Sequence, residues 1–309
     1  MPTDIIPELL ARVDEERLRR GILHLSKDPL PYRKLNHTLP GHGKCTLYEA
    51  DDYVQSCLES WSYQVETEGV EVQAYRSDPS KPKAHQYSPP APDDPWYTAY
   101  NLYARKVGIG RPDETVVVLA HKDSQSWVDS PGAYDNAVGT AAVLEIARIL
   151  SAIETRRSVW FLFCNEEHTP WTSAVAAERA KALGDDLVAI INLDGLGGKS
   201  SEDTAAGRKT NVTRYVTPEG ARLADLMAEV NAAYRIGLEQ RACPQEAPGD
   251  DDGSFVKAGF PAAIANIGSL PYADPNYHLE SDVPEQVDIE NVRMAVQASL
   301  AAVVRLALA

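Results

Sequence analysis

Three apolar runs in the middle of the chain decide its fold: TVVVLA at 115–120, SVWFLFC at 158–164 and LVAIINL at 187–193. Helical patterns separate these runs, roughly over 136–152 and 173–183. Continuous apolar strands joined by helices are typical of a sheet that is covered on both faces. We therefore expect an α/β fold, a three-layer α/β/α sandwich with a central mixed, mostly parallel β-sheet.

Polar residues follow each of the three runs. His121 comes directly after the first run, Glu166 and Glu167 shortly after the second, and Asp194 directly after the third. Ligands of such sheets bind beyond the carboxyl ends of the strands. Because parallel strands end at the same edge, we expect these side chains to lie close together. Asp123 shares the face of His121 in an extended chain, so its carboxylate can accept the second ring N–H of that histidine.

Two more residues of metal-ligand type complete a candidate constellation. Asp135 stands where the first long helix is expected to begin, and His278 lies in the loop PNYHLESD at 275–282. Two imidazoles and three carboxylates suffice to hold two zinc ions that share one carboxylate. Cobalt or manganese accept a similar ligand set. Glu166 is then the spare base that a metal-activated water needs. The predicted ligands are His121, Asp135, Glu167, Asp194 and His278.

Each of these residues also has an ordinary structural explanation. Asp135 could cap a helix N-terminus, Asp194 could cap the turn that follows it, and His278 could be a solvated loop histidine. Glu166 and Glu167 could be exposed loop acids. His168 is not expected to be a ligand, because the two glutamates already fill the roles. The occurrence of all these residues at successive strand ends favours the metal interpretation.

Five blocks of the sequence, in this order, resemble the co-catalytic zinc aminopeptidase family. That family includes bacterial leucine aminopeptidases, aminopeptidase Y-like enzymes, the catalytic domain of glutamate carboxypeptidase II and, more distantly, glutaminyl cyclases. The resemblance runs from about residue 97 to the C-terminus. The blocks are AHKDS (120–124), SPGAYDNAVGTAAVLEIAR (130–148), FLFCNEE (161–167), INLDG (191–195) and YHLESD (277–282).

The resemblance implies a role for each site residue. One zinc would be held by His121 and Asp194, the other by Glu167 and His278, and Asp135 would bridge them. Glu166 would be the general base and Asp123 the partner of His121. A cis peptide is expected at Asp135–Asn136. In the pocket-shaping segment 249–262 the matching residues include Asp251 and Phe255, and Tyr277 is the third expected substrate-binding residue. The stretch HTPWTS (168–173) departs from the glycine-rich stretch usual in relatives, which leaves the pocket near Trp171 open.

The implied activity is zinc-dependent exopeptidase action on a peptide or aminoacyl substrate, and an aminopeptidase is favoured. The alternatives are a carboxypeptidase or amidohydrolase and a single-zinc acyltransferase resembling glutaminyl cyclase. A carboxypeptidase needs a cation for the substrate carboxylate, and Arg208, Lys209 and Arg214 are the nearest candidates in the expected loop 199–216. A binding protein that has kept only the fold is disfavoured, because every site position is filled.

Composition narrows the partners. The chain has 309 residues and a net charge of −15, from 30 basic and 45 acidic side chains. An acidic chain repels phosphate backbones and anionic lipid surfaces, so neither nucleic acid nor a membrane is expected as a partner. We see no signal peptide or spanning segment and expect a cytoplasmic protein. The four cysteines form no metal-type pair, and a Cys45–Cys57 bridge stays open.

We expect one domain over 1–309, with a helical segment 1–60 packed on the catalytic part. Its helices are predicted at 4–25 and 50–61, with a loop over 26–46. The proline-rich stretch 77–95 is predicted to be a surface excursion between two strands, or alternatively a rim of the site or a subunit contact. Further predictions are strands at 70–75, 96–106 and 262–268, helices at 218–234 and from about 289, and a polar loop at 241–254.

Overall fold

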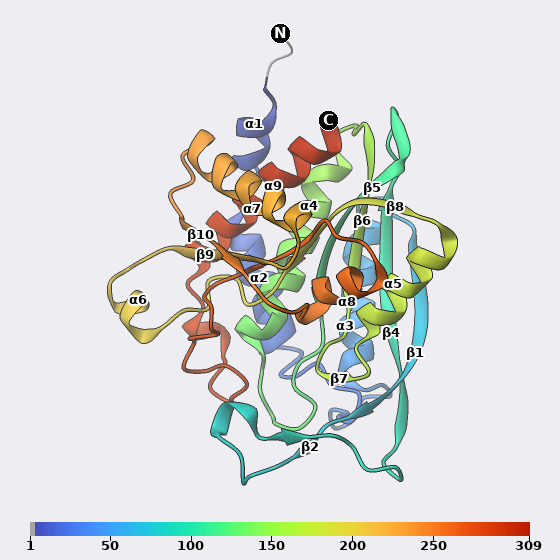
Figure 1. The fold of residues 1–309 in the computed structure, drawn as a ribbon. Coiled ribbons are helices and arrows are strands. Elements are labelled where there is room, and N and C mark those ends of the chain that lie inside the picture. Colours follow the sequence, from blue (N-terminus) through green and yellow to red (C-terminus); the bar gives the residue numbers. More distant parts are fainter. Residues whose placement is uncertain (1–3) are drawn as a thin grey trace.

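A computed structural model describes residues 4–309 and shows a nine-stranded mixed sheet with helices on both faces (Figure 1). The sheet order is β10-β9-β11-β8-β5-β6-β4-β1-β7. The central strands β11, β8, β5 and β6 are parallel, whereas β4 and β1 continue the sheet in antiparallel register. The predicted fold class is confirmed. The strands are β1 (Val65–Ala74), β4 (Trp96–Lys106), β5 (Arg111–His121), β6 (Arg157–Cys164), β7 (His168–Thr169), β8 (Asp186–Leu193), β9 (Thr210–Tyr215), β10 (Glu239–Pro244) and β11 (Ala263–Ile267).

The two faces of the sheet are packed by different sets of helices. Successive residues of β5 point to opposite faces. Val116 and Val118 therefore belong to the larger core, while Val117 and Leu119 belong to the smaller one. The larger core contains α2 (Glu15–Ser26), α3 (Thr46–Ser60), α4 (Val138–Ser151), α7 (Pro218–Ala233) and α9 (Ile289–Leu308). The smaller core contains α5 (Thr172–Leu183) and α8 (Asp250–Ala258).

The first sixty residues pack into the larger core. Leu18, Ile22 and Val54 are fully buried there. The predicted single helix over 4–25 is wrong in one respect, because two helices, α1 (Ile6–Leu10) and α2, stand in its place. The carboxylate of Asp14 accepts hydrogen bonds from the backbone N–H of Glu16 and Arg17 and so starts α2 as an N-cap.

Two segments predicted as loops contain regular structure. Strand β9 and the short helix α6 (Ser201–Ala205) lie within 199–216, and β10 and the start of α8 lie within 241–254. The sequence of β9 is not an apolar run, although the strand is mostly buried. Its polar side chains can be buried because they form hydrogen bonds with one another and with neighbouring strands. Thr213 Oγ1 donates to Asn266 Oδ1 at 2.6 Å, and Asn211 Nδ2 donates to Gln240 Oε1 at 2.9 Å.

Helix α9 is the only helix in the described part of the chain that is long and apolar enough to cross a membrane. Of its most apolar window, 72% is buried inside the fold. It also contacts β5 and β6 in the larger core. It therefore serves here as a core helix. The four cysteines are free, so the open Cys45–Cys57 bridge is not formed.

Candidate metal centre

The sheet brings the strand-end residues together as predicted. His121 is the last residue of β5, and it stands level with Cys164 at the end of the parallel neighbour β6. Glu167 lies three residues beyond that end, and Asp194 directly follows β8 on the other side of β5. Parallel strands that end level therefore deliver an imidazole and two carboxylates to one edge.

Two groups of potential ligand atoms meet at this edge and share one residue. His121 Nε2 lies 3.1 Å from Asp135 Oδ1 and 3.3 Å from Asp194 Oδ1. His278 Nε2 lies 3.0 Å from Asp135 Oδ2 and 3.3 Å from Glu167 Oε1. Asp135 thus presents one oxygen to each group. All five predicted ligands fall into these two groups, and all are buried.

The backbone around Asp135 holds its carboxylate between the two groups. Asp135 lies in the turn Ala133–Ala137 ahead of α4, and the expected cis peptide to Asn136 is present. The residue at the N-cap of α4 is Ala137, so Asp135 is not a helix cap. The Asp282 carboxylate accepts the backbone N–H of Tyr134 at 2.9 Å and of Asp135 at 3.1 Å.

Asp123 connects both glutamates to the histidine. Its carboxylate lies 3.3 Å from His121 Nδ1 and accepts the backbone N–H of Glu166 and Glu167 at 2.9 and 2.8 Å. His168 belongs to neither ligand group, and its Nδ1 lies 2.8 Å from Asp123. Burial alone would raise the pKa of Asp123, but the hydrogen bonds with His121 and His168 outweigh it and lower that pKa. Asp123 is therefore a carboxylate that orients the His121 ring.

The protein alone leaves this site short of positive charge. Burial, reinforced by Asp251 and Asp250, raises the pKa of Glu166 well above its usual range. Burial and the neighbouring Asp135 raise the pKa of Glu167 to about 7. Burial would lower the pKa of His121, but the neighbouring carboxylates of Asp123, Asp135 and Asp194 raise it well above normal.

These shifts, together with one orphaned atom, fit a divalent cation pair. Within residues 4–309 the buried Oδ1 of Asp194 has no hydrogen-bond partner. Two divalent cations would supply the missing charge and the missing partner. The two groups are consistent with a di-zinc centre.

A cavity of about 190 Å³ opens onto both ligand groups. Its walls combine carboxylates with aromatic rings, and they include Tyr277, as predicted, and Trp171, where the sequence left the pocket open. None of the described residues that line it is a lysine or an arginine. The lining residues are Tyr75, Tyr87, Trp127, Asp135, Glu166, Glu167, Trp171, Asp194, Asp250, Tyr272, Tyr277 and His278.

Two residues expected to bind substrate do not reach this cavity. Asp251 is fully buried and accepts a hydrogen bond from Cys164 Sγ at 3.0 Å. Phe255 packs in the smaller core beside Phe260. The expected loop 241–254 ends in the helix α8, which contains both residues. Asp251 and Phe255 are four residues apart, so they share one face of this helix. That face points into the core, and Asp250 reaches the cavity instead.

Sequence reasoning missed two parts of the site. Gln125 is fully buried, and its Nε2 lies 2.6 Å from Asp135 Oδ2 and 3.1 Å from Glu167 Oε1. Gln125 could have been predicted from its spacing, because it lies two residues after Asp123 and residues two apart in an extended chain point the same way. The other part is Asp250, whose Oδ2 accepts hydrogen bonds from Arg214 and, at 2.8 Å, from the Tyr272 hydroxyl. No pattern in the sequence indicates that arrangement.

The fold and the paired ligand groups together define a metallopeptidase-type α/β protein with two adjoining candidate metal sites. A model of Peptidase family M28 matches residues 101–303. The chain therefore belongs to peptidase family M28.

Known proteins agree with this assignment. Leucine aminopeptidase 1 of Sclerotinia sclerotiorum is 26% identical over 218 residues, covering 65% of this chain and 54% of the relative. The chain thus spans about half the length of that curated relative. An aminopeptidase from Aneurinibacillus sp. strain AM-1 has the same fold, with a TM-score of 0.74, 15% identity and coverage of 98% and 96%. A glutaminyl cyclase of Bacteroides thetaiotaomicron aligns with a TM-score of 0.70, 16% identity and coverage of 94% and 97%.

Proposed function

We propose that the protein is a zinc-dependent aminopeptidase that removes N-terminal residues from peptides. His121 and Asp194 would hold one zinc ion, Glu167 and His278 would hold the other, and Asp135, which belongs to both groups, would serve both ions. The observation that carries the proposal is the pair of buried ligand groups sharing Asp135. Membership of a peptidase family supports a peptide substrate.

The chain's own residues divide the catalytic work. The bound zinc ions supply a water of lowered pKa and polarise the scissile carbonyl. Glu166 belongs to neither ligand group, lines the cavity and has Oε2 3.9 Å from His121 Nε2. It is therefore placed to accept a proton from the attacking water and to return it to the leaving amine. Asp123 keeps the His121 ring in the orientation that directs Nε2 to its ligand group.

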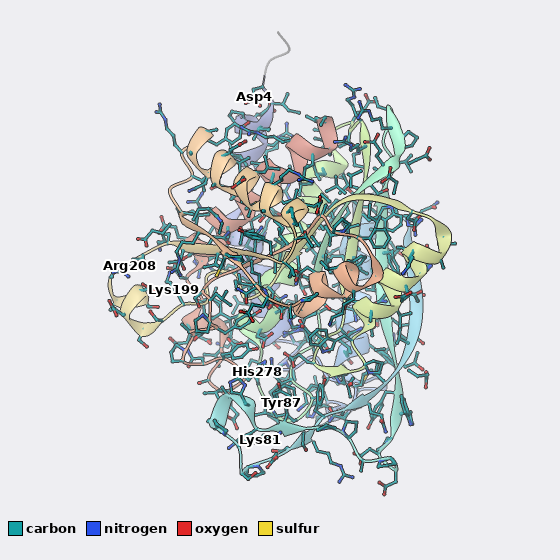
Figure 2. All side chains as sticks on the ribbon, in the orientation of Figure 1. Asp4, Lys81, Tyr87, Lys199, Arg208 and His278 are labelled. Atoms are coloured by element: carbon teal, nitrogen blue, oxygen red, sulfur yellow. The ribbon has the colours of Figure 1, made fainter. Side chains whose placement is uncertain are left out.

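The charge of the cavity supports an aminopeptidase over a carboxypeptidase. A substrate carboxylate needs a cation, and the three candidates from the sequence are paired with other groups. Arg208 pairs with Asp203 at 2.6 Å, Lys209 pairs with Asp288 at 2.8 Å, and Arg214 pairs with Asp250. Arg208 also lies on the α6 excursion, well to the side of His278 (Figure 2).

Asp250 is the proposed anchor for the substrate's α-ammonium group. Its Oδ2 is held by Arg214 and Tyr272, and the Tyr272 hydroxyl also lies 2.8 Å from Asp194 Oδ2. Asp250 therefore stands next to the Asp194 end of the site, and it lines the cavity. A free amino terminus bound there would offset the excess of carboxylates.

The deciding experiment compares aminoacyl anilides with their N-acetylated forms and with N-acetylated dipeptides that keep a free carboxyl terminus, with and without a chelator. We expect chelator-sensitive cleavage of the free aminoacyl substrates only. Cleavage confined to N-blocked substrates would remove the aminopeptidase assignment. Metal analysis should find two zinc ions per chain, whereas a single ion would favour the cyclase-like alternative.

A variant at Glu166 tests the mechanism separately from metal binding. Glu166→Gln should keep both zinc ions and lower kcat by about 10²–10⁴-fold, the range expected for a lost general base. The matched control is Glu202→Gln on the exposed helix α6, which should retain full activity. A fully active Glu166→Gln enzyme would exclude this residue as the base.

A further inference from the structure

A small two-stranded hairpin, separate from the main sheet, contacts the candidate metal centre. It consists of the paired strands β2 (Arg76–Ser77) and β3 (Tyr87–Ser88) and a nine-residue tip, 78–86. The carbonyl oxygen of Ala84, in the tip, lies 3.0 Å from Nδ1 of His278. Figure 2 shows Tyr87 of this hairpin beside His278, with Lys81 of the tip on its outer side.

The partner of Nδ1 decides which ring nitrogen of His278 carries a proton. A carbonyl oxygen only accepts hydrogen bonds, so Nδ1 must be the donor. Nε2 is then the nitrogen left for a metal, and it faces Asp135 at 3.0 Å and Glu167 at 3.3 Å. This mirrors His121, whose Nδ1 lies against the Asp123 carboxylate. Each metal-site histidine thus has its own orienting acceptor.

The packing around His278 alone does not determine which of the two flipped orientations its ring adopts. Tyr277 stacks on the His278 ring with centroids 3.8 Å apart, and Trp127 meets it edge-on at 5.1 Å. These rings fix the plane of the imidazole, but a half-turn about the Cβ–Cγ bond keeps that plane and exchanges Nδ1 for a carbon. The hydrogen bond to Ala84 is what distinguishes the two orientations.

The hairpin tip holds its own shape. Residues Lys83–His85 form one 3₁₀ turn, and the Asp78 carboxylate accepts the Ser80 hydroxyl at 2.6 Å. The tip is also tied to the loop of His278, because Lys83 pairs with Glu280 at 3.3 Å. The Ala84 carbonyl is therefore presented by a structured turn and not by an extended strand.

We propose that the hairpin tip 78–86 is a positioning element of the metal centre, which orients His278 through the Ala84 carbonyl. The inference rests on the proposed function only in taking His278 as a zinc ligand. It gives the proline-rich stretch 77–95 a role in the site that its sequence does not reveal.

The test removes the carbonyl and keeps the hairpin. Replacing residues 78–86 by Asn-Gly, the preferred two-residue turn, keeps the β2–β3 pairing and Tyr87. Zinc affinity is measured by competition with a chelating dye. We expect one zinc ion to bind as in the wild type and the other to bind about 10–100-fold more weakly, as is usual when a ligand loses its orienting partner. Equal affinity of both ions in the shortened and wild-type proteins would overturn the proposal.

A control variant shows whether the effect is specific to the hairpin, and a second measurement gives a result even if the shortened chain does not fold. Lys44→Ala removes an exposed ion pair to Asp52, outside the hairpin, and leaves the Ala84 carbonyl in place, so it should bind both zinc ions as the wild type does. If the shortened chain does not fold, nitrogen-15 spectra of the histidine rings in the zinc-loaded wild type decide the question, with His278→Gln identifying the signal. We expect the ring proton of His278 on Nδ1, and a proton on Nε2 would refute the proposal. A protein that binds two zinc ions in this way but cleaves no peptide would defeat only the proposed function.

Discussion

A single buried arginine supports the turn that carries the shared ligand, and its removal should be costly. Arg33 lies in the connection 27–45 between α2 and α3, and its side chain is fully buried. Its guanidinium donates to the carbonyl oxygens of Lys122 at 2.7 Å and of Pro131 and Gly132 at 2.8 Å, and also to that of Leu25. These bonds connect the end of β5 to the turn that precedes Asp135.

The expected loss of stability follows from the backbone carbonyl groups that would lose the hydrogen bonds donated by Arg33. Arg33→Leu leaves the carbonyl groups of Leu25, Lys122 and Pro131 without their donor, whereas Gly132 keeps the hydrogen bond from the backbone N–H of Ala137. Each buried unpaired group costs about 1–3 kcal/mol, so we take about 3 kcal/mol as the lower end. Unfolding entropy is roughly 2.1 cal/mol/K per residue, or about 0.65 kcal/mol/K for 309 residues. The melting temperature should therefore fall by about 5 °C or more.

The loss should be larger without metal. Burial lowers the pKa of Arg33 to about 10, while Asp123, Asp282, Asp135 and Glu167 act in the opposite direction. The guanidinium is thus a counter-charge to the site carboxylates, and it matters most when no cation is bound.

Calorimetry of the variant with and without zinc measures both effects. Arg222→Leu is the control, because Arg222 is exposed and pairs only with Glu219 one turn away on the same helix, so little change is expected. If Arg33→Leu melted within about 2 °C of the wild type in both metal states, the reasoning about buried carbonyls would fail.

Three further outcomes test other parts of the structure. Burial, with Asp250 as the next cause, raises the pKa of Asp252 to about 8, so the fold favours its neutral form. This group should then make stability fall as pH rises from about 4 to about 8, by up to about 1.4 kcal/mol per unit, and Asp252→Asn should make the fall smaller. Urea midpoints at several pH values measure it, and parallel curves would contradict it. Chelation should lower the melting temperature, since the carboxylates lose their cations, and zinc should restore it; identical melting curves would argue against a bound metal. Asp250→Asn should raise KM for free aminoacyl anilides about tenfold, the equivalent of about 1.4 kcal/mol, and an unchanged KM would exclude this residue as the amine anchor.

The sequence revealed the parts of the fold whose residues form apolar runs. β5, β6 and β8 are buried on both faces, so their sequences are apolar throughout and their ends are easy to place. β9 and β10 carry polar or exposed side chains, and no local pattern separates them from loops. α8 was missed because its N-terminal residues are acids whose burial depends on distant partners.

The same distinction holds for the metal centre. Residues that follow strand ends were brought together as their positions predicted. Contacts made by backbone atoms left no trace in the residue pattern, and Ala84 and His278 are 194 positions apart. Asp250 lines the cavity, whereas the predicted residue Asp251 faces the core. Which of these two neighbours faces the cavity depends on the rotation of helix α8, and the sequence did not predict that helix.

The order of the ligands along the chain has a consequence for biosynthesis. Of the two groups joined by Asp135, one is complete once residue 194 has been made, and the other requires His278. The core that supports both also needs α9, which follows at Ile289–Leu308. A ribosome must therefore release almost all of these 309 residues before the proposed peptidase acquires its second cation. If the proposed function holds, the nascent polypeptide would have no complete site for cleaving N-termini until His278 and α9 have been made.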